Sequence, residues 1–153
     1  MKALVVVDYQ VDFVDGALGF PGAEKLEQII LDKIANCRST GGQVIFTLDT
    51  HGEDYLATQE GKRLPVPHCI RGTWGHALAD GLTVRAEAGR IEKPTFGSTA
   101  LGELVRSRFA AGEIDRVELV GLCTDICVIS NALLCKAFCP ELPVSVDAAR
   151  RAC

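Results

Sequence analysis

Short apolar runs alternate with helical segments along this chain, and that alternation limits the fold more than any other feature. The apolar runs are rich in Val, Ile and Leu, and they are "ALVVVDY" (3–9), "QVIFTLD" (43–49), "RVELVGL" (116–122) and "PVSVDA" (143–148). Runs of this length and composition are typical of strands that are buried on both faces. Between them, residues 25–38 and 99–110 repeat apolar residues at helical spacing.

Strands that alternate with helices predict an α/β fold, namely a three-layer α/β/α domain with a mainly parallel sheet. We expect a single domain over residues 1–153, because no linker, internal repeat or low-complexity segment interrupts the pattern. Ligands of such folds bind beyond the carboxyl ends of the strands, so functional residues should follow the predicted strands. The Gly- and Pro-rich segment 52–75 is long for a connection inside a compact domain, and such segments are usually functional or partly disordered.

The composition excludes several classes of protein. The 153 residues are 48% hydrophobic with a mean hydropathy of +0.19, which excludes a disordered chain. The net charge is -4 and no run rich in Lys or Arg occurs, so we expect no nucleic-acid partner. The apolar run near the N-terminus, residues 3–7, is too short for a secretion signal or a membrane span. We therefore expect a cytoplasmic protein without a membrane partner.

Two cysteines, Cys123 and Cys127, stand where a predicted strand passes into a helix. The chain has seven cysteines, an odd number, and without an export signal a disulfide framework is not expected. Thr124 or Asp125 is the expected N-cap, which places Cys127 in the first helical turn. There the unpaired N–H groups and the helix dipole lower a thiol pKa and favour a nucleophilic thiolate. The same N–H groups suit an oxyanion hole.

Two other roles stay open for these cysteines. A redox pair usually has two residues between its cysteines, whereas three separate Cys123 from Cys127. A four-cysteine zinc site would add Cys135 and Cys139, but these lie about two turns or more further along the same helix. We expect Cys135 and Cys139 to be buried core thiols.

A nucleophilic thiol needs a proton acceptor, and Asp8 is the candidate. A carboxylate at the end of an apolar strand is unfavourable unless it is paired, although an isolated aspartate there could also serve as a cap or a loop anchor. Lys93 ends a further predicted strand in "RIEKPTF" and, taken alone, would be a surface lysine. Beside Asp8 and Cys127, its charge would stabilise both anions.

A third set of residues suits a divalent metal ion. Asp49 and His51 lie on the same side of a strand end, and "PVPHC" adds His68. Two imidazoles and one carboxylate with open positions suit zinc, iron or manganese, and zinc is the first expectation. His76, the remaining histidine, is expected at the surface near a helix start.

Five motifs occur in the order and spacing of one known family, and they are "VVVDYQVDF", "TLDTHGEDY", "PHCIRGTWG", "IEKPTFGS" and "VGLCTDICV". Over residues 1–148 the chain resembles the isochorismatase-like cysteine hydrolases, and it is most similar to their nicotinamidase (pyrazinamidase) branch. The resemblance implies the isochorismatase-like hydrolase fold and a homo-oligomer. Members of that family usually continue beyond "DAARRAC" with a helix and an edge strand, which are expected to be missing here.

The resemblance implies a catalytic triad in which Asp8 is the general base, Lys93 the electrostatic partner and Cys127 the nucleophile. The expected partner is a small-molecule amide, with nicotinamide converted to nicotinic acid and ammonia through a thioester. By the same resemblance, the backbone N–H groups of Cys123 and Cys127 form the oxyanion hole, and the Leu122–Cys123 peptide is cis.

The resemblance also extends to the binding residues. In metal-containing nicotinamidases, the pyridine nitrogen meets an ion held by residues that match Asp49, His51 and His68. Phe13 matches an aromatic residue that packs on the substrate ring. Pro65 stands where nicotinamidases usually have a tryptophan, so either another residue stacks on the ring or the substrate is not nicotinamide.

Other functions stay open. Another C–N hydrolase of the superfamily, such as an N-carbamoyl or ureido amidase, would prefer an anionic substrate, and Arg71 is the one nearby arginine. A non-catalytic ligand- or metal-binding relative and a thiol-based redox sensor are the remaining alternatives. Relatives often have a further histidine between the two metal motifs, and Glu53, Asp54 or a water molecule is expected in its place here.

Overall fold

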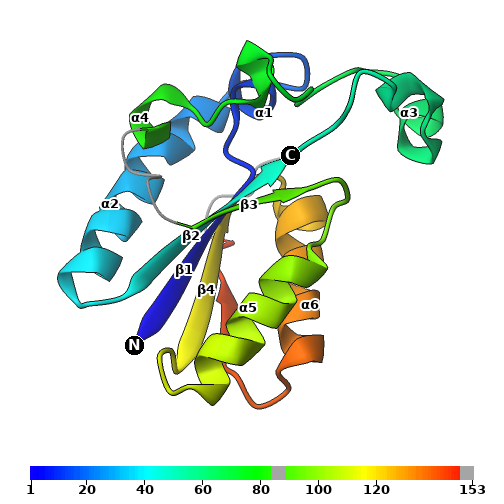
Figure 1. Cartoon of the computed structure of the whole chain (residues 1–153). Helices are drawn as coiled ribbons and strands as arrows, with labels where there is room; N and C mark the ends of the chain where they lie inside the picture. The colour runs from blue at the N-terminus through cyan, green and yellow to red at the C-terminus, as the bar shows by residue number, and fades with distance from the viewer. Residues whose placement is uncertain (84–88, 149–153) are drawn as a thin grey trace.

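A parallel β-sheet forms the central layer of the molecule (Figure 1). The computed structural model describes residues 1–83 and 89–148, and in this part of the chain five parallel strands form one sheet in the order β3-β2-β1-β4-β5. The strands are β1 (Lys2–Val7), β2 (Gln43–Asp49), β3 (Arg90–Lys93), β4 (Arg116–Gly121) and β5 (Val144–Val146). The predicted α/β fold with a parallel sheet is confirmed.

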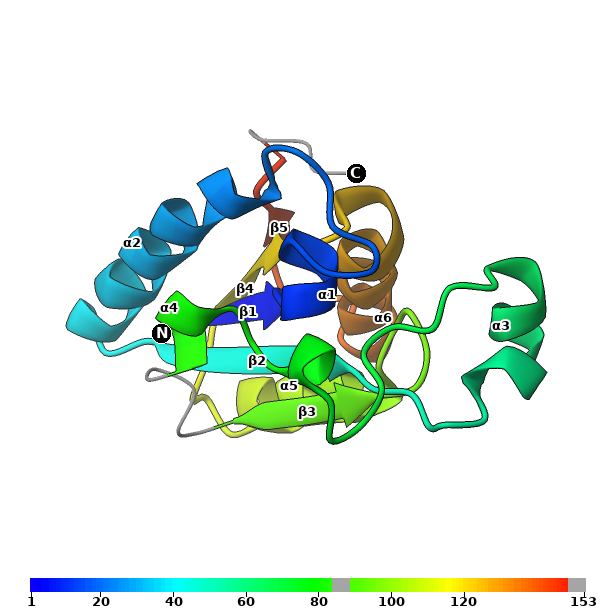
Figure 2. The ribbon, with the colours of Figure 1, turned by 90° about the horizontal axis from the view of Figure 1, so that it is seen from above.

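Helices cover both faces of the sheet (Figure 2). One face packs against α2 (Leu26–Ser39) and α4 (Asp80–Thr83), and the other against α5 (Thr99–Ala110) and α6 (Ile129–Phe138). The sequence of the central strand β1 is continuously apolar because both of its faces are buried. Leu4 and Val6 join the α2 core, whereas Ala3, Val5 and Val7 join the core under α5 and α6. None of the helices in the described ranges is long and apolar enough to cross a membrane.

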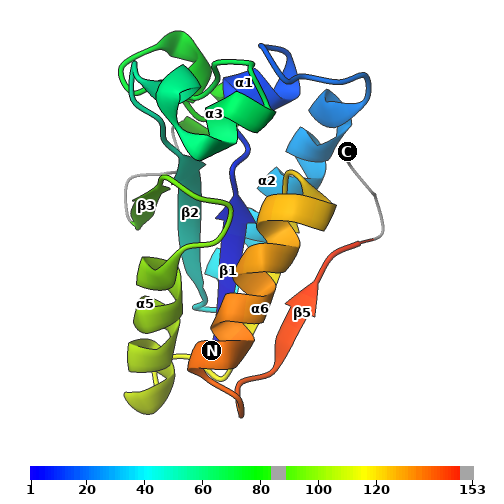
Figure 3. The same cartoon turned by 90° about the vertical axis from the view of Figure 1, so that its right-hand side faces the viewer.

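The segments beyond the carboxyl ends of the strands fold over the tips of the sheet (Figure 3). After β1 come α1 (Val11–Val14) and η1 (Ala23–Lys25), and after β2 come η2 (Tyr55–Ala57), α3 (Gln59–Arg63) and η3 (Trp74–His76). A π-helical turn, η4 (Thr124–Val128), joins β4 to α6. The long segment 52–75 is therefore folded, and its main chain is tied to the end of β2 by the His51 N–H, which donates to the Cys69 carbonyl oxygen (3.0 Å).

The strand order reverses at β1, because β2 and β3 lie on one side of it and β4 and β5 on the other. Such a reversal opens a crevice between the tips of the two strands that flank it, which are β1 and β4 here. Gly121 closes β4 at this point with a φ of 135°, and a Cβ on it would lie 2.1 Å from the Val7 carbonyl oxygen. Glycine is therefore required for the close approach of the two strand ends.

We expect Gly121→Ala to lower the free energy of unfolding by about 2–5 kcal/mol, because it combines backbone strain with a steric clash. Gly112→Ala is the matched control. Its φ is also positive (74°), but nothing lies within 4 Å of the added Cβ, so only the backbone term of about 1–2 kcal/mol remains. Urea denaturation of both variants measures the difference, and equal losses would contradict the clash with Val7.

Candidate active site and metal centre

A buried ion pair between Asp8 and Lys93 lies at the centre of the site. Asp8, the first residue after β1, has a φ of 47°, which few non-glycine residues adopt. Its fully buried carboxylate accepts a hydrogen bond from the Thr47 hydroxyl at Oδ1 (2.7 Å) and lies 2.6 Å from the Lys93 ammonium at Oδ2. Lys93 ends β3, is 1% exposed, and also donates to the Thr95 carbonyl oxygen (3.0 Å). The structure thus pairs two charged residues that follow or end predicted strands.

Burial and the neighbouring charges shift the pKa values of Asp8 and Lys93 in opposite directions. Burial lowers the pKa of Lys93, but Asp8, Cys127 and Asp49 raise it by a larger amount, so the ammonium stays protonated. Burial raises the pKa of Asp8, and the positive charge of Lys93 opposes this shift without cancelling it. A carboxylate with a raised pKa is a stronger base than an exposed aspartate. The pair therefore offers a base beside a stable positive charge.

Cys127 lies in the π-helical turn η4, between β4 and α6. The Val128 N–H donates to the Cys123 carbonyl oxygen (3.0 Å), which is the spacing of a π-helix. The predicted N-cap at Thr124 or Asp125 is wrong, because Cys123 occupies the N-cap position and makes no side-chain capping hydrogen bond. Single π-helical turns occur frequently at functional sites.

The Cys127 thiol is neutral in the resting site. Its side chain is almost fully buried, and burial raises its pKa. The charge of Asp8 and a hydrogen bond with it raise the pKa further, while Lys93 opposes the shift. The expected lowering by the helix N-terminus is therefore wrong, because desolvation outweighs it. A nucleophilic role would require this thiol to lose its proton, and the neighbouring Asp8 carboxylate is a candidate acceptor.

Asn131 fixes the turn that carries Cys127. This fully buried residue donates from Nδ2 to the carbonyl oxygens of Cys127 (2.8 Å) and Phe96 (3.1 Å), and its Oδ1 accepts from the Ser98 N–H (2.9 Å). It thus ties the start of α6 to the loop after β3. The Leu122–Cys123 peptide just before the turn is cis, as the resemblance implies. Sequence reasoning missed Asn131, although a single asparagine on the apolar stripe of a helix is a recognisable signal.

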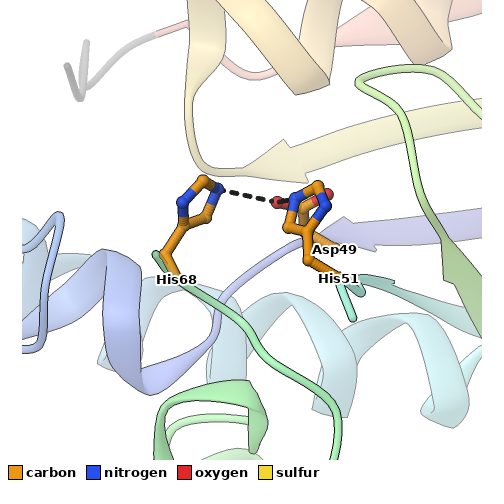
Figure 4. A group of neighbouring side chains, drawn as sticks. All are labelled: Asp49, His51 and His68. Atoms are coloured by element: carbon orange, nitrogen blue, oxygen red, sulfur yellow. Dashed lines mark hydrogen bonds and ion pairs between the residues drawn. The ribbon is translucent and has the colours of Figure 1, made fainter. Parts of the chain in front are cut away.

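Asp49, His51 and His68 lie side by side (Figure 4). Their candidate ligand atoms are all within 4.8 Å of one another, and all three residues are buried. Asp49 Oδ2 lies 2.9 Å from His51 Nε2 and 3.3 Å from His68 Nε2. His76 lies outside this group. It is half-buried rather than at the surface as expected, and its Nε2 lies 2.9 Å from the Thr50 hydroxyl.

The surroundings of these residues fit a bound cation. His68 Nδ1–H donates to the Val66 carbonyl oxygen (2.7 Å), so in the neutral ring the Nε2 lone pair faces the Asp49 carboxylate. Two acceptors so close call for a cation or a proton between them. Burial raises the pKa of Asp49, but His51, His68 and Lys93 lower it by more, so the group is a carboxylate. This donor set suits zinc, iron or manganese.

Glu60 is a fourth polar residue at this centre, and sequence reasoning missed it. Its Oε1 lies 3.7 Å from His51 Nε2 and 3.8 Å from His68 Nε2. Glu53 and Asp54, which were expected in place of a further metal-binding side chain, are exposed instead. No spacing rule would have found Glu60, because an irregular connection separates it from β2.

A cavity of about 240 Å³ joins the cysteine turn to the candidate metal centre. Cys123 and Cys127 line it on the side of α6, while Asp49, Glu60 and His68 line it on the side of β2 and α3. The rest of the wall is apolar and consists of Phe13, Leu18, Leu64, Phe96 and Ile126. The cavity therefore brings Phe13, the predicted ring-packing residue, into the same space as both polar groups.

Comparison with known proteins shows the family of this chain. Residues 2–145 match the family model described as "Isochorismatase domain". The chain belongs to this family. A Bacillus subtilis (strain 168) protein described as "Uncharacterized isochorismatase family protein PncA" is 32% identical over 143 residues, which cover 86% of this chain and 76% of that protein.

Solved structures of isochorismatase-like proteins share the fold. The pyrazinamidase/nicotinamidase from Streptococcus mutans UA159 has a TM-score of 0.81 and 28% identity, and the match covers 95% of this chain and 84% of that chain. The N-carbamoylsarcosine amidase from Thermoplasma acidophilum has a TM-score of 0.78 and 28% identity, and the match covers 99% and 84% of the two chains. The family resemblance seen in the sequence is thus confirmed.

We expect Glu60→Gln to weaken the zinc affinity of this isochorismatase-family protein about tenfold, because a carboxylate next to both imidazoles is lost. Competition with a chromophoric chelator measures the affinity. Glu53→Gln removes the same charge from an exposed position of the same connection and should leave the affinity unchanged. Equal affinities of Glu60→Gln and the wild type would show that Glu60 has no part in metal binding.

We expect the Cys127 thiol to titrate above the ordinary range of about 8.5 for free cysteine. Asp8→Asn removes the negative charge and the hydrogen bond that raise the pKa and leaves Lys93 unopposed, so the titration should move to lower pH. Thiolate absorbance against pH, corrected with Cys127→Ala, measures both values. An Asp8→Asn variant that titrates at the same pH as the wild type would contradict the coupling.

Proposed function

We propose that this chain is an amidohydrolase of the isochorismatase family that cleaves a small, neutral aromatic carboxamide, with nicotinamide as the first candidate. One observation carries the proposal. The buried thiol of Cys127, whose pKa responds to the Asp8 carboxylate that is paired with Lys93, borders the same apolar cavity as the candidate metal centre. The structural likeness to the S. mutans pyrazinamidase/nicotinamidase supports the choice of substrate.

In the first half of the proposed reaction, Cys127 Sγ bonds to the carboxamide carbon and its proton passes to Asp8. The carbonyl electron pair moves to the oxygen, and we assign the stabilisation of this oxyanion to the backbone N–H groups of Cys123 and Cys127. The amide nitrogen then takes the proton from Asp8 and leaves as ammonia. A thioester on Cys127 remains.

In the second half, Asp8 takes a proton from a water molecule that attacks the thioester carbon. The C–S bond breaks when the second tetrahedral intermediate collapses, and the sulfur recovers its proton from Asp8. The product is the carboxylic acid. The thiol and carboxylate return to their starting states, so one water is consumed and one ammonia is released for each amide.

The remaining polar residues of the site stabilise negative charge and orient the substrate. Lys93 keeps its proton and stabilises the anionic forms of Asp8 and Cys127. We assign to Asp49, His51 and His68 the binding of a divalent ion, zinc in first place, since iron and manganese share this donor set. When bound, such an ion supplies a Lewis acid that can take a ring nitrogen as a ligand.

The walls of the cavity favour a neutral aromatic substrate. Phe13 and Phe96 offer two aromatic faces, and Phe96 can thereby replace the tryptophan whose place is taken by Pro65. Among the described residues that line the cavity there is no arginine or lysine. Arg71 is 65% exposed and paired with Glu92, so it does not offer its charge to the cavity.

An N-carbamoyl substrate is the second candidate, because the chain also resembles the T. acidophilum N-carbamoylsarcosine amidase. Such a substrate carries a carboxylate, which is unfavourable in an apolar cavity unless a cation pairs with it. The Glu60 carboxylate on the cavity wall would repel it. A divalent ion at the candidate metal centre would offset this repulsion.

We expect the zinc-loaded protein to release ammonia from nicotinamide and Cys127→Ala to lose this activity to the uncatalysed background. Cys135→Ala is the matched control, since it removes a fully buried thiol of α6 that lies in the core and not at the cavity, and it should retain activity close to that of the wild type. Residual activity in Cys127→Ala would end the thioester mechanism. Release from N-carbamoylsarcosine but not from nicotinamide would favour the second candidate.

A further inference from the structure

One buried side chain, that of Gln10, joins the segment after β1 to the metal-binding end of β2. Gln10 is fully buried. Its Oε1 accepts a hydrogen bond from the Asp49 N–H (2.8 Å), and its Nε2 donates to the Asp49 carbonyl oxygen (2.9 Å). The same Nε2 donates to the His76 carbonyl oxygen (2.9 Å). Both main-chain polar groups of Asp49 are therefore held by one side chain.

These hydrogen bonds replace main-chain bonds that the sheet would otherwise form. The β1–β2 register pairs Val7 with Thr47, and the Asp8 N–H continues the ladder to the Thr47 carbonyl oxygen (3.1 Å). A parallel ladder in this register would next join the Asp49 N–H to the Asp8 carbonyl and the Gln10 N–H to the Asp49 carbonyl. Instead, the Gln10 N–H bonds to the Asp8 carbonyl oxygen (2.9 Å), because the chain turns away at Asp8.

The turn at Asp8 places its carboxylate beside Lys93, but it leaves the main chain of Asp49 without its ladder partners on that side. The Gln10 amide supplies both. On the other side of β2 the ladder continues, since the Thr50 N–H donates to the Lys93 carbonyl oxygen (2.9 Å). The end of β2 is thus held at both edges, through Thr50 by the main chain of Lys93 and through Asp49 by the side chain of Gln10.

The chemistry of the position suits a primary amide. An amide has one oxygen that accepts and two N–H groups that donate, and Gln10 uses the oxygen and both donors here. A carboxylate in its place would face two carbonyl oxygens with no proton to donate. An apolar side chain would leave the buried N–H and carbonyl groups of Asp49 unsatisfied.

The orientation of Asp49 matters because its carboxylate is shared. Oδ2 faces His51 (2.9 Å) and His68 (3.3 Å), while Oδ1 lies 3.8 Å from the Lys93 ammonium. A small rotation of the main chain would move both oxygens together. By holding this main chain, Gln10 therefore sets the distances from the Asp49 carboxylate to the two histidines and to Lys93.

We propose that Gln10 is a positioning residue for the metal centre, which fixes the Asp49 main chain where β1 leaves the sheet and so presents the carboxylate to a divalent ion. This inference rests on the metal-binding part of the proposed function. It concerns the affinity for the ion, and it does not depend on which amide is cleaved.

The test compares the zinc affinity of the metal-free protein and its variants by competition of Zn²⁺ with a chromophoric chelator, well below the unfolding temperature of each variant. Gln10→Met keeps the length of the side chain and removes all three hydrogen bonds, and we expect the affinity to fall about 10- to 100-fold. Gln10→Asn keeps an amide that is one methylene shorter, and we expect a fall in the same direction.

Asn131→Leu is the matched control. It removes another fully buried amide with three hydrogen bonds, but these hold the Cys127 turn and not Asp49, so the zinc affinity should stay at the wild-type value. Wild-type affinity in Gln10→Met and Gln10→Asn would overturn the inference, and so would an equal loss in Asn131→Leu. A wild-type protein that binds no zinc would overturn it together with the metal assignment, whereas ammonia release from nicotinamide tests the amidase proposal separately.

Discussion

The ion pair of Asp8 and Lys93 is the interaction on which the rest of the site depends. Two buried charges are unfavourable to remove from water, and they are tolerated only with close contact and additional hydrogen bonds. The hydroxyl of Thr47 and the carbonyl of Thr95 supply those bonds here. The pair forms only if β1 and β3 flank β2 in the observed register, which aligns Val7 with Thr47 and Asp49 with Lys93. The register of the sheet thus determines the geometry of the site.

The site has two halves that meet at Asp49. One half is the thiol with its base and lysine, and the other is the group of histidines with the Glu60 carboxylate. Because Asp49 Oδ2 faces the histidines and Oδ1 faces Lys93, a change of charge in one half is felt in the other. The candidate metal centre and the Asp8–Lys93 ion pair therefore have Asp49 as a common neighbour.

Much of this arrangement could be predicted from the sequence, because the relevant residues follow strands and parallel strand ends meet at one edge. The helix expected over residues 99–110 is α5, and Asp49, His51 and His68 are placed together as the spacing indicates. Glu60 could not be predicted, since an irregular connection carries it back to the site. Gln10 was equally hidden, because its partners are main-chain groups 39 and 66 residues away.

The thiol shows why a local rule failed. The dipole and the unpaired N–H groups at a helix N-terminus predict a lowered pKa for Cys127. The side chain is nevertheless buried beside a carboxylate, and desolvation with like charge outweighs the dipole. The pKa of Cys127 therefore depends on tertiary packing, which cannot be read from the residues next to it in the sequence.

A neutral, buried thiol also has a chemical consequence for the resting protein. Peroxide and similar oxidants attack the thiolate, and exposure sets how fast they do so. Cys127 has neither the charge nor the exposure of a redox-sensing cysteine. In the proposed reaction its sulfur becomes strongly nucleophilic only when the proton passes to Asp8. The same burial that raises the pKa of this thiol therefore also protects it from irreversible oxidation.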